Sequence, residues 1–239
     1  MRIALAFMLL MTATVIADDK LWTNLLAGDK LDSFTGKSER WTFAKSVSLD
    51  GRNPKKLTFE LGPGILVNGE KGNAADLYTN EKFGDVEIHV EFCIAKGSNS
   101  GVKFHGHYEI QILDSFGKKE LTGDDCGGIY PRAELTPRYR YLDTGIAPKV
   151  NACKAAGEWQ GLDVIFLAPR FDTVGKKTAN AKIVKAMLND QVIHENQEME
   201  TPTGHNFTKK EMAVGPLMFQ GDHGPVAFRN LRVRAYAGK

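Results

Sequence analysis

Cysteine is scarce in this chain of 239 residues, which has only Cys93, Cys126 and Cys153. Three cysteines cannot all pair, and no two of them have CxxC spacing, so a cysteine-based zinc site is poorly supported. Cys93 lies in the apolar stretch VEFCIA and is expected to be a thiol in the core. Cys126 and Cys153 lie in a loop-rich region and are the pair expected to form a disulfide after export, if one forms.

An excess of either charge is also missing. Lys and Arg number 31 against 29 Asp and Glu, which gives a net charge of +2, and the two signs are intermixed along the chain. Because no basic block stands out, we expect no nucleic-acid partner.

Long apolar runs are absent except at the N-terminus. MRIALAFMLLMTATVIA, residues 1–17, has one basic residue followed by an apolar run and ends in a small residue. This pattern is typical of a secretory signal peptide, so we expect a periplasmic or secreted protein with no membrane anchor after cleavage. Residues 18–239 contain no linker, repeat or low-complexity segment and are expected to form one domain.

Helical periodicity is missing as well, because no amphipathic window exceeds about three turns. Strand patterns separated by Gly, Asn, Asp and Pro replace it, at 56–61, 64–69, 86–95, 101–113, 162–168, 183–196, 215–220 and 226–236. A tight turn is expected at 188–191, inside the range 183–196. Many short strands without alternating helices predict an all-β sandwich or jelly roll of antiparallel sheets.

The familiar catalytic motifs are not found: there is no GxSxG elbow, phosphate loop, HExxH or EF-hand loop. The stretch GVKFHGHYEIQIL, 101–113, alternates instead, and we expect one strand with polar side chains on one face. Those side chains are Lys103, His105, His107, Glu109 and Gln111. Adjacent side chains on one face are roughly 6.5–7 Å apart, so His105 to Gln111 would form a row about 20 Å long.

Such a row could form the floor of a substrate groove, or it could simply face solvent, as the outer side of many antiparallel sheets does. Two His and one Glu at successive positions on one face favour the groove. A surface strand without a function could equally well carry Thr, Ser and Lys. His105 and His107 are also spaced compatibly with a divalent metal, but that spacing is not specific.

Three further features accompany this row. Asp222 and His223 lie between two glycines in a predicted turn, where the acid could orient the imidazole or the residues could serve turn geometry alone. Trp159 precedes a predicted strand and could stack on a sugar ring or pack at the rim of the core. Residues 114–158 have turn-rich composition and several aromatics, which suggests an ordered loop forming a groove wall.

Several segments resemble the domain of unknown function numbered 1080, described as the 3-keto-disaccharide hydrolase or 3-keto-glucoside lyase/hydratase domain. They are FGDVEIHVEF (83–92), KGSNSGVKFHGHYEIQILDS (96–115), CGGIYPRAEL (126–135), GEWQGLDVIFLAPRFD (157–172) and GPLMFQGDHGPVAFRNLRVR (215–234). The resemblance covers nearly all of 18–239 in order. It implies a concanavalin-A-like jelly roll of two antiparallel sheets in an exported protein.

The same class of sheet carries laminarinase-type glycosidases, whose catalytic strand reads ExDxE. Here Gln111 stands at the position of the middle acid, so the strand offers one secure carboxylate, Glu109. A conventional glycosidase needs two carboxylates about 5–10 Å apart. A 3-keto sugar reduces that need, because its ketone acidifies the C2 hydrogen and the C1 substituent can then be eliminated.

The resemblance therefore predicts an enzyme that cleaves 3-keto-glycosides by 1,2-elimination and hydration. Glu109 and His105 are expected to be the acid/base residues, with the assignment of base and acid left open. The residues expected to contact substrate are Lys103, His107, Gln111, Trp159, Asp222 and His223. A cofactor is not a firm expectation, although a divalent metal bound by His is one option for stabilising the enolate, beside Lys or an amide. The alternative is a non-catalytic carbohydrate-binding module of the same fold, and an ordinary glycosidase ranks third.

Overall fold

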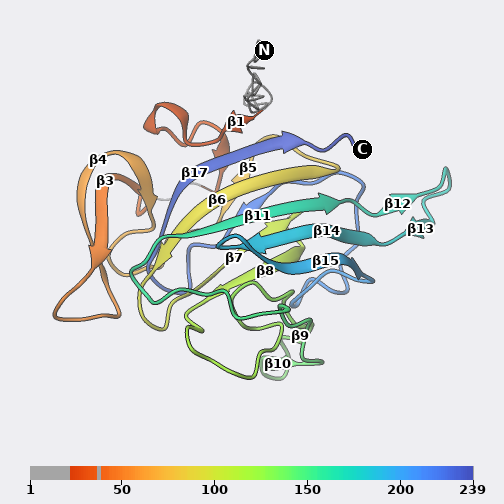
Figure 1. Ribbon diagram of the computed structural model, residues 1–239. Helices are drawn as coiled ribbons and strands as arrows, with labels where there is room; N and C mark the ends of the chain where they lie inside the picture. The colour runs from red at the N-terminus through yellow and green to blue at the C-terminus, as the bar shows by residue number, and fades with distance from the viewer. Residues whose placement is uncertain (1–21, 37–38, 239) are drawn as a thin grey trace, which may run out of the picture.

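The computed structural model describes residues 22–36 and 39–238, so the signal peptide predicted for 1–17 lies outside the described residues. Two antiparallel sheets are stacked face to face (Figure 1). One has eight strands, in the order β15-β14-β11-β6-β17-β4-β3 with β1 paired to β17. The other has five, in the order β2-β5-β16-β7-β8. The predicted all-β jelly roll of two antiparallel sheets is confirmed.

The strands of the eight-stranded sheet are β1 (Thr23–Asn24), β3 (Thr42–Leu49), β4 (Leu57–Val67), β6 (Val86–Ile94), β11 (Gln160–Leu167), β14 (Ala181–Leu188), β15 (Gln191–Met199) and β17 (Val226–Ala235). Those of the five-stranded sheet are β2 (Phe34–Thr35), β5 (Leu77–Thr79), β7 (Asn99–Phe104), β8 (Tyr108–Leu113) and β16 (Met218–Phe219). Two short pairs are formed by β9 (Ala133–Glu134) with β10 (Arg140–Tyr141) and by β12 (Arg170–Phe171) with β13 (Lys177–Ala179). A short 3-10 helix covers Ala27–Asp29.

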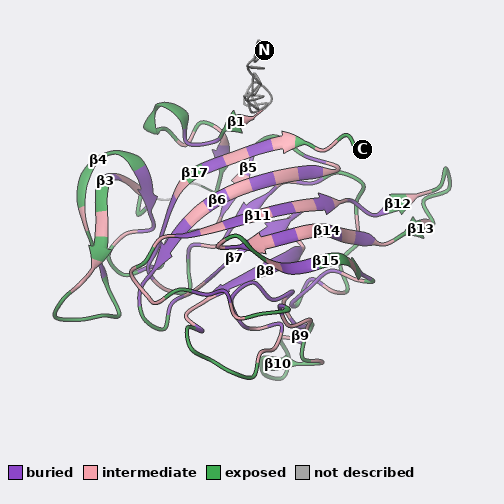
Figure 2. Cartoon of the chain, in the orientation of Figure 1, coloured by how far each residue is buried: buried purple, intermediate pink, exposed green. Residues whose placement is uncertain are grey.

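The core lies between the two sheets. Along β11 and along β6 from Val86 to Phe92 every second residue is buried, which matches the two-residue period of a strand with one face on the core. Phe104 of β7 stacks on Phe166 of β11 with ring centroids 4.7 Å apart, and this contact joins the two sheets. Figure 2 shows the alternation of buried and half-buried residues along these strands.

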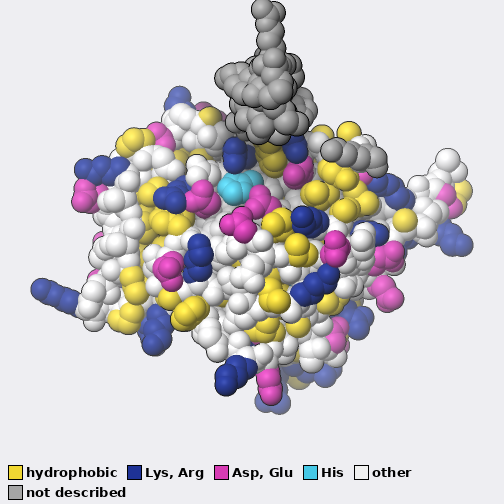
Figure 3. Space-filling view, viewed as in Figure 1, with side chains coloured by type: hydrophobic (Ala, Val, Ile, Leu, Met, Phe, Trp, Pro, Cys, Tyr) yellow, Lys and Arg dark blue, Asp and Glu magenta, His cyan; other side chains and the backbone are white. Residues whose placement is uncertain are grey.

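The outer face of the eight-stranded sheet is covered by charged side chains. Glu87 pairs with Arg234 and Glu91 with Arg229, each pair joining β6 to β17. Figure 3 shows acidic and basic side chains intermixed over the visible surface. Among the described residues, no helix is long and apolar enough to cross a membrane.

The predicted single strand at 101–113 is wrong, because these residues form the β7–β8 hairpin with a turn at 105–107. His105 and Gly106 adopt the left-handed conformation, with φ of 54° and 68°. Lys103 pairs with Glu109 and Phe104 with Tyr108. A turn of three residues keeps odd-numbered residues opposite odd-numbered ones, so the polar–apolar alternation runs through the turn unchanged.

In the eight-stranded sheet, one predicted turn is confirmed, two predicted strands form one strand, and β3 was not predicted. The turn at 188–191 is confirmed: Asn189 and Asp190 connect β14 to β15 with φ of 50° and 64°. The ranges 56–61 and 64–69 belong mainly to one strand, β4, whose register shifts between Leu61 and Ile65 opposite Ala44. The partner strand β3 was not predicted.

The three cysteines are all buried with free thiols. Cys93 packs in a second apolar cluster as expected. Cys126 and Cys153 do lie together, but a hydrogen bond joins them and the expected disulfide is not formed. The Cys126 thiol, together with contacts to Ser115 and Gln160, lowers the pKa of Cys153 despite its burial.

Candidate active site

The hairpin places an ion pair on the face of the five-stranded sheet that points away from the core. Lys103 Nζ lies 3.1 Å from Glu109 Oε2, and the two residues are direct cross-strand neighbours. The Glu109 residue is only 3% exposed. Gly101 leaves the space for this carboxylate, since a Cβ there would lie 2.3 Å from Glu109 Oε1.

Burial and charge act in opposite directions on this pair. Burial raises the pKa of Glu109 above its ordinary value, and the Lys103 ammonium offsets only part of that rise. Burial by itself lowers the pKa of Lys103, but the neighbouring Glu109 carboxylate more than reverses this and raises it. Lys103 therefore keeps its positive charge beside a carboxyl group whose proton affinity is increased, the direction that strengthens a general base.

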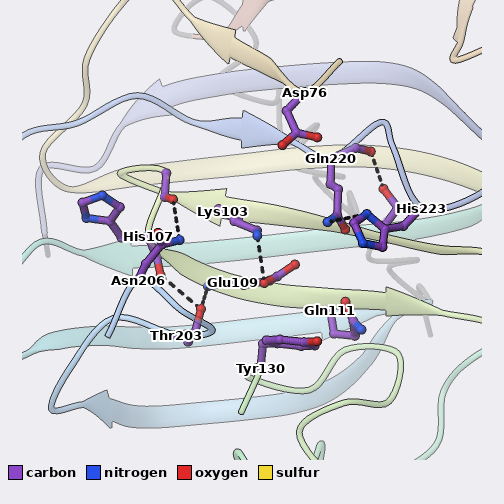
Figure 4. A network of polar contacts seen from close by, with 12 residues as sticks. Asp76, Lys103, His107, Glu109, Gln111, Tyr130, Thr203, Asn206, Gln220 and His223 are labelled. Atoms are coloured by element: carbon purple, nitrogen blue, oxygen red, sulfur yellow. Dashed lines mark hydrogen bonds and ion pairs between the residues drawn. The ribbon is translucent and has the colours of Figure 1, made fainter. Parts of the chain in front are cut away.

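A cavity of about 380 Å³ opens above this pair, which is within the ~300–1,000 Å³ of small-molecule sites. Three parts of the chain wall it: the β7–β8 hairpin, the loop at 114–159 and the segment at 204–223. The lining residues are Asn99, Lys103, Glu109, Tyr130, Leu135, Tyr139, Gly204, His205, Asn206, Gln220 and His223. The expectation that the long loop forms a groove wall is confirmed. Figure 4 shows the side chains of Tyr130, Asn206, Gln220 and His223 arranged around Lys103 and Glu109.

A second cavity of about 320 Å³ adjoins the first and shares Lys103, His205 and Asn206 with it. Asp76 and His107 are among its further lining residues. Burial raises the pKa of Asp76. Burial lowers the pKa of His107, and the Lys209 ammonium adds to that effect. Together the two cavities form a groove along the outer face of the hairpin, with both polar and apolar residues in its lining.

Thr203 joins the hairpin to the segment that covers it. Its hydroxyl donates to the His107 carbonyl at 3.0 Å and accepts from the Glu109 backbone N–H at 3.0 Å. These bonds fix the start of β8 and bring His205 and Asn206 beside the ion pair.

The turn carrying Asp222 and His223 is held by two buried or half-buried side chains. Asn68 Nδ2 donates to the carbonyls of Gly221 and Gly224, and its Oδ1 accepts from the Val226 N–H at 2.8 Å. Asp76 Oδ1 accepts from the Gly221 N–H at 3.0 Å.

The predicted pair in this turn does form. Asp222 contacts His223 Nδ1, which orients the exposed imidazole, and Gln220 Nε2 lies 3.2 Å from the same nitrogen. His223 lines the Glu109 cavity, whereas Asp222 does not line it and contacts His223 instead. The structure therefore brings Lys103, Glu109 and His223 together as predicted.

His105 is not brought to Glu109. The turn directs its ring against Phe166, with centroids 5.2 Å apart, and its Nδ1 donates to the Met212 carbonyl at 3.0 Å. Burial lowers its pKa. His105 borders the second cavity, as does His107, and neither side chain lines the Glu109 cavity. The predicted row of four side chains is thus divided by the turn.

Gln111 lies on the same strand face as Glu109 but is buried and tied to the long loop. Its Nε2 donates to Asp124 Oδ1 at 3.2 Å, and its Oε1 is buried with no hydrogen-bond partner in the structure. It supports the floor of the cavity and does not line it.

Trp159 lies away from the groove. It packs on the second apolar cluster of the eight-stranded sheet, and the Arg229 guanidinium sits 4.1 Å from its ring centroid. The position of Trp159 therefore does not support stacking on a sugar in this groove. Trp159 packs at the rim of the core, which was the alternative.

Sequence reasoning missed several residues of the groove, chiefly Asp76, Tyr130, Tyr139, His205, Asn206 and Gln220. They come from loops and strand ends far apart in the chain. The aromatic content of 114–158 was the one available indication, and it pointed to the wall without singling out Tyr130 or Tyr139. Among residues 22–36 and 39–238, no three His, Cys, Asp or Glu are grouped to hold a metal, so the His105–His107 option lacks a further ligand.

Comparison with known proteins adds to this geometry. A family model described as a 3-keto-alpha-glucoside-1,2-lyase-like domain matches residues 21–234, and the resemblance seen in the sequence is confirmed. No curated protein matches the chain in sequence.

Solved structures from Parabacteroides distasonis share the fold. One titled "putative glycosyl hydrolase" has a TM-score of 0.62 and 23% identity, covering 90% of this chain and 84% of that one. A second with the same description has a TM-score of 0.57 and 19% identity, covering 90% of this chain and 99% of that one. At these identities the likeness establishes the shared architecture.

Proposed function

The chain belongs to the carbohydrate-active family of 3-keto-alpha-glucoside-1,2-lyase-like domains, and from that membership we propose that it cleaves 3-keto-glycosides by 1,2-elimination followed by hydration. The observation that carries the proposal is the buried Glu109–Lys103 pair. Glu109 is the one carboxylate among the described residues lining its cavity. Asp76, the other carboxylate of the groove, lines only the adjoining cavity, so a two-carboxylate mechanism of the ordinary glycosidase type would have to span both cavities.

The first step uses Glu109 as base. Its carboxylate removes the C2 proton of the sugar, and the electron pair moves toward the C3 ketone to form an enolate. Lys103 Nζ, 3.1 Å from the base, is placed to donate to the developing oxyanion. The increased proton affinity of Glu109 makes its ionised carboxylate a stronger base for this transfer.

The second step expels the C1 substituent. The enolate electron pair forms the C1–C2 double bond while the C1–O bond breaks, and the departing oxygen needs a proton. His223 is suited to supply it, because Asp222 holds its Nδ1 and the ring borders the cavity.

Hydration then completes net hydrolysis. Water adds to C1 with loss of a proton, and C2 receives a proton from Glu109 after this carboxyl group has exchanged its proton with solvent. In this scheme His105 and His107 border only the second cavity and take no part in the proton transfers. Glu109 and His223 are the acid/base pair, in place of the expected Glu109 and His105.

The test compares a 3-keto-glucoside with its unoxidised parent. The wild-type protein should cleave the first and leave the second intact. Glu109→Gln should lower kcat by roughly 10²–10⁴-fold, the usual contribution of a positioned base. Glu158→Gln, at an exposed position outside the cavity, serves as the matched control. Full activity of Glu109→Gln would overturn the role of this residue, and binding without turnover of either compound would favour a carbohydrate-binding module.

A further inference from the structure

The wall of the cavity formed by the long loop has an unusual surface. Leu135 is 55% exposed, Tyr139 48% and Tyr141 43%, and all three lie within the short β9–β10 region. Leu135 and Tyr139 also line the Glu109 cavity together with Tyr130. A cluster of exposed apolar and aromatic side chains at the wall of a cavity is a common feature of sites that bind an apolar surface.

The three tyrosines are held in fixed positions. The Tyr130 hydroxyl lies 2.9 Å from the hydroxyls of both Tyr139 and Tyr141. The Tyr141 ring meets the other two edge to face, with centroids 5.7 Å apart in each case. Because the hydroxyls are engaged with one another, the wall presents rigid ring surface to the cavity.

The loop that carries these rings is itself tied down. Glu134 pairs with Arg140 across β9 and β10 at 2.6 Å, and Arg132 pairs with Asp143 at 2.7 Å. A rigid aromatic surface binds a ring with little loss of conformational entropy.

The position of the wall relative to Glu109 indicates which part of a substrate reaches it. Glu109 acts at C2, so the substituent on C1 must extend from the neighbouring carbon. The opposite wall is polar, with Asn99, Gln220 and His223, and the latter is suited to protonate the departing oxygen. The apolar wall is the surface left for the body of the leaving group.

We propose that Leu135, Tyr139 and Tyr130 form a subsite for a leaving group that presents an apolar ring face, either an aryl ring or the C–H face of a second sugar. This subsite rests on the proposed function, because it assumes that a C1 substituent leaves from the Glu109 cavity. It assigns to the β9–β10 loop the stacking role that the sequence suggested for Trp159.

The experiment uses three substrates: the methyl, the phenyl and a glucosyl 3-keto-glucoside. Wild-type protein should show a lower KM for the two ring-bearing substrates than for the methyl one. Tyr139→Ala should raise KM by about three- to tenfold for the ring-bearing substrates, the effect expected for one aromatic contact, and leave the methyl substrate within about twofold. The relative preference for phenyl and glucosyl substrates distinguishes the two sources of the ring.

Two further variants isolate the ring surface. Tyr139→Phe keeps the ring and removes the hydroxyl, so it should retain the preference for ring-bearing substrates. Phe116→Ala removes a 62% exposed ring of the same long loop that does not line the cavity and should change nothing. An equal rise in KM for all three substrates with Tyr139→Ala, or the same effect from Phe116→Ala, would overturn the subsite.

The experiments distinguish a failure of the proposed function from a failure of the subsite. If no substrate is cleaved, the elimination mechanism is wrong, and calorimetric titration with the phenyl and methyl compounds still tests the subsite. Tighter binding of the phenyl compound that is lost in Tyr139→Ala supports it, and equal affinities contradict it.

Discussion

At the scale of single residues, the chemistry depends on how Lys103 and Glu109 influence each other. Burial favours the protonated carboxyl and the adjacent ammonium favours the carboxylate. The balance leaves Glu109 with a pKa above the ordinary ~4.3, the direction that suits a base. Both residues were identified in the sequence, but their ion pair was not, because it depends on the turn between them.

The pair predicts a pH dependence. A base must be ionised to act, so kcat/KM should fall as pH drops through the raised pKa of Glu109. Lys103→Met removes the cation that lowers this pKa, and the acid limb of the profile should move to higher pH while the maximum activity falls. The measurement is kcat/KM against pH for both proteins.

Lys154→Met is a control, since this lysine lies outside the cavity. An acid limb that stays in place in Lys103→Met, or moves to lower pH, would contradict the role given to Glu109.

At the scale of elements, the β7–β8 hairpin and the turn at 220–224 do most to build the site. A period-two pattern predicts which side chains share a face, and the odd-numbered polar side chains of β7 and β8 do so. It cannot reveal a three-residue turn, because His105–His107 preserve the alternation. The residues expected to form a row about 20 Å long are therefore folded back on each other, and Lys103 pairs with Glu109 across the hairpin.

The close fit between β7 and β8 makes Gly101 critical. In Gly101→Ala, the new Cβ would lie 2.3 Å from Glu109 Oε1, so the carboxylate must move away from Lys103. Because the buried carboxylate is also separated from Lys103, the free energy of unfolding should fall as well, by up to the ~3–5 kcal/mol of a broken buried ion pair. Activity should fall by about 10²-fold, as expected for a misplacement of about 1 Å.

Gly51→Ala is the matched control, as nothing lies within 4 Å of a Cβ at that position. Thermal unfolding and kcat/KM are measured for both variants. Activity at the wild-type level in Gly101→Ala would show that the carboxylate position is not critical.

Asn68 holds the turn at 220–224, which carries His223, through three hydrogen bonds. Asn68→Ala leaves two carbonyls and the Val226 N–H without their partner, each worth about 1–3 kcal/mol when buried. We expect the free energy of unfolding to fall by about 3 kcal/mol or more, measured by urea denaturation, with a loss of activity through His223.

Asn180→Ala, which removes an exposed hydrogen bond to Glu198, should cost less than about 0.5 kcal/mol. Similar values for the two variants would show that Asn68 does not hold the turn.

At the scale of the whole molecule, the outward faces of the two sheets differ. The five-stranded sheet carries the groove, while the outer face of the eight-stranded sheet carries cross-strand ion pairs and the second apolar cluster. The sequence predicted the fold class well, since strand periodicity is local. It placed Trp159 in the groove and missed Tyr139, because which loop reaches which face depends on the complete packing.

Trp159 provides a test of this division. Trp159→Ala should lower the free energy of unfolding by about 2 kcal/mol, less than the ~3–5 kcal/mol of a fully buried aromatic residue. The KM for 3-keto-glycosides should remain unchanged. A rise in KM with unchanged stability would instead return Trp159 to the binding site.

The most direct test of elimination and hydration is to cleave a 3-keto-glucoside in D₂O and locate deuterium in the 3-keto-glucose product by NMR and mass spectrometry. The account predicts deuterium at C2, since the C2 proton is removed before solvent returns one. The free product, incubated with the protein in the same solvent, measures background exchange. A cleaved product with no deuterium at C2 above that background would contradict the mechanism.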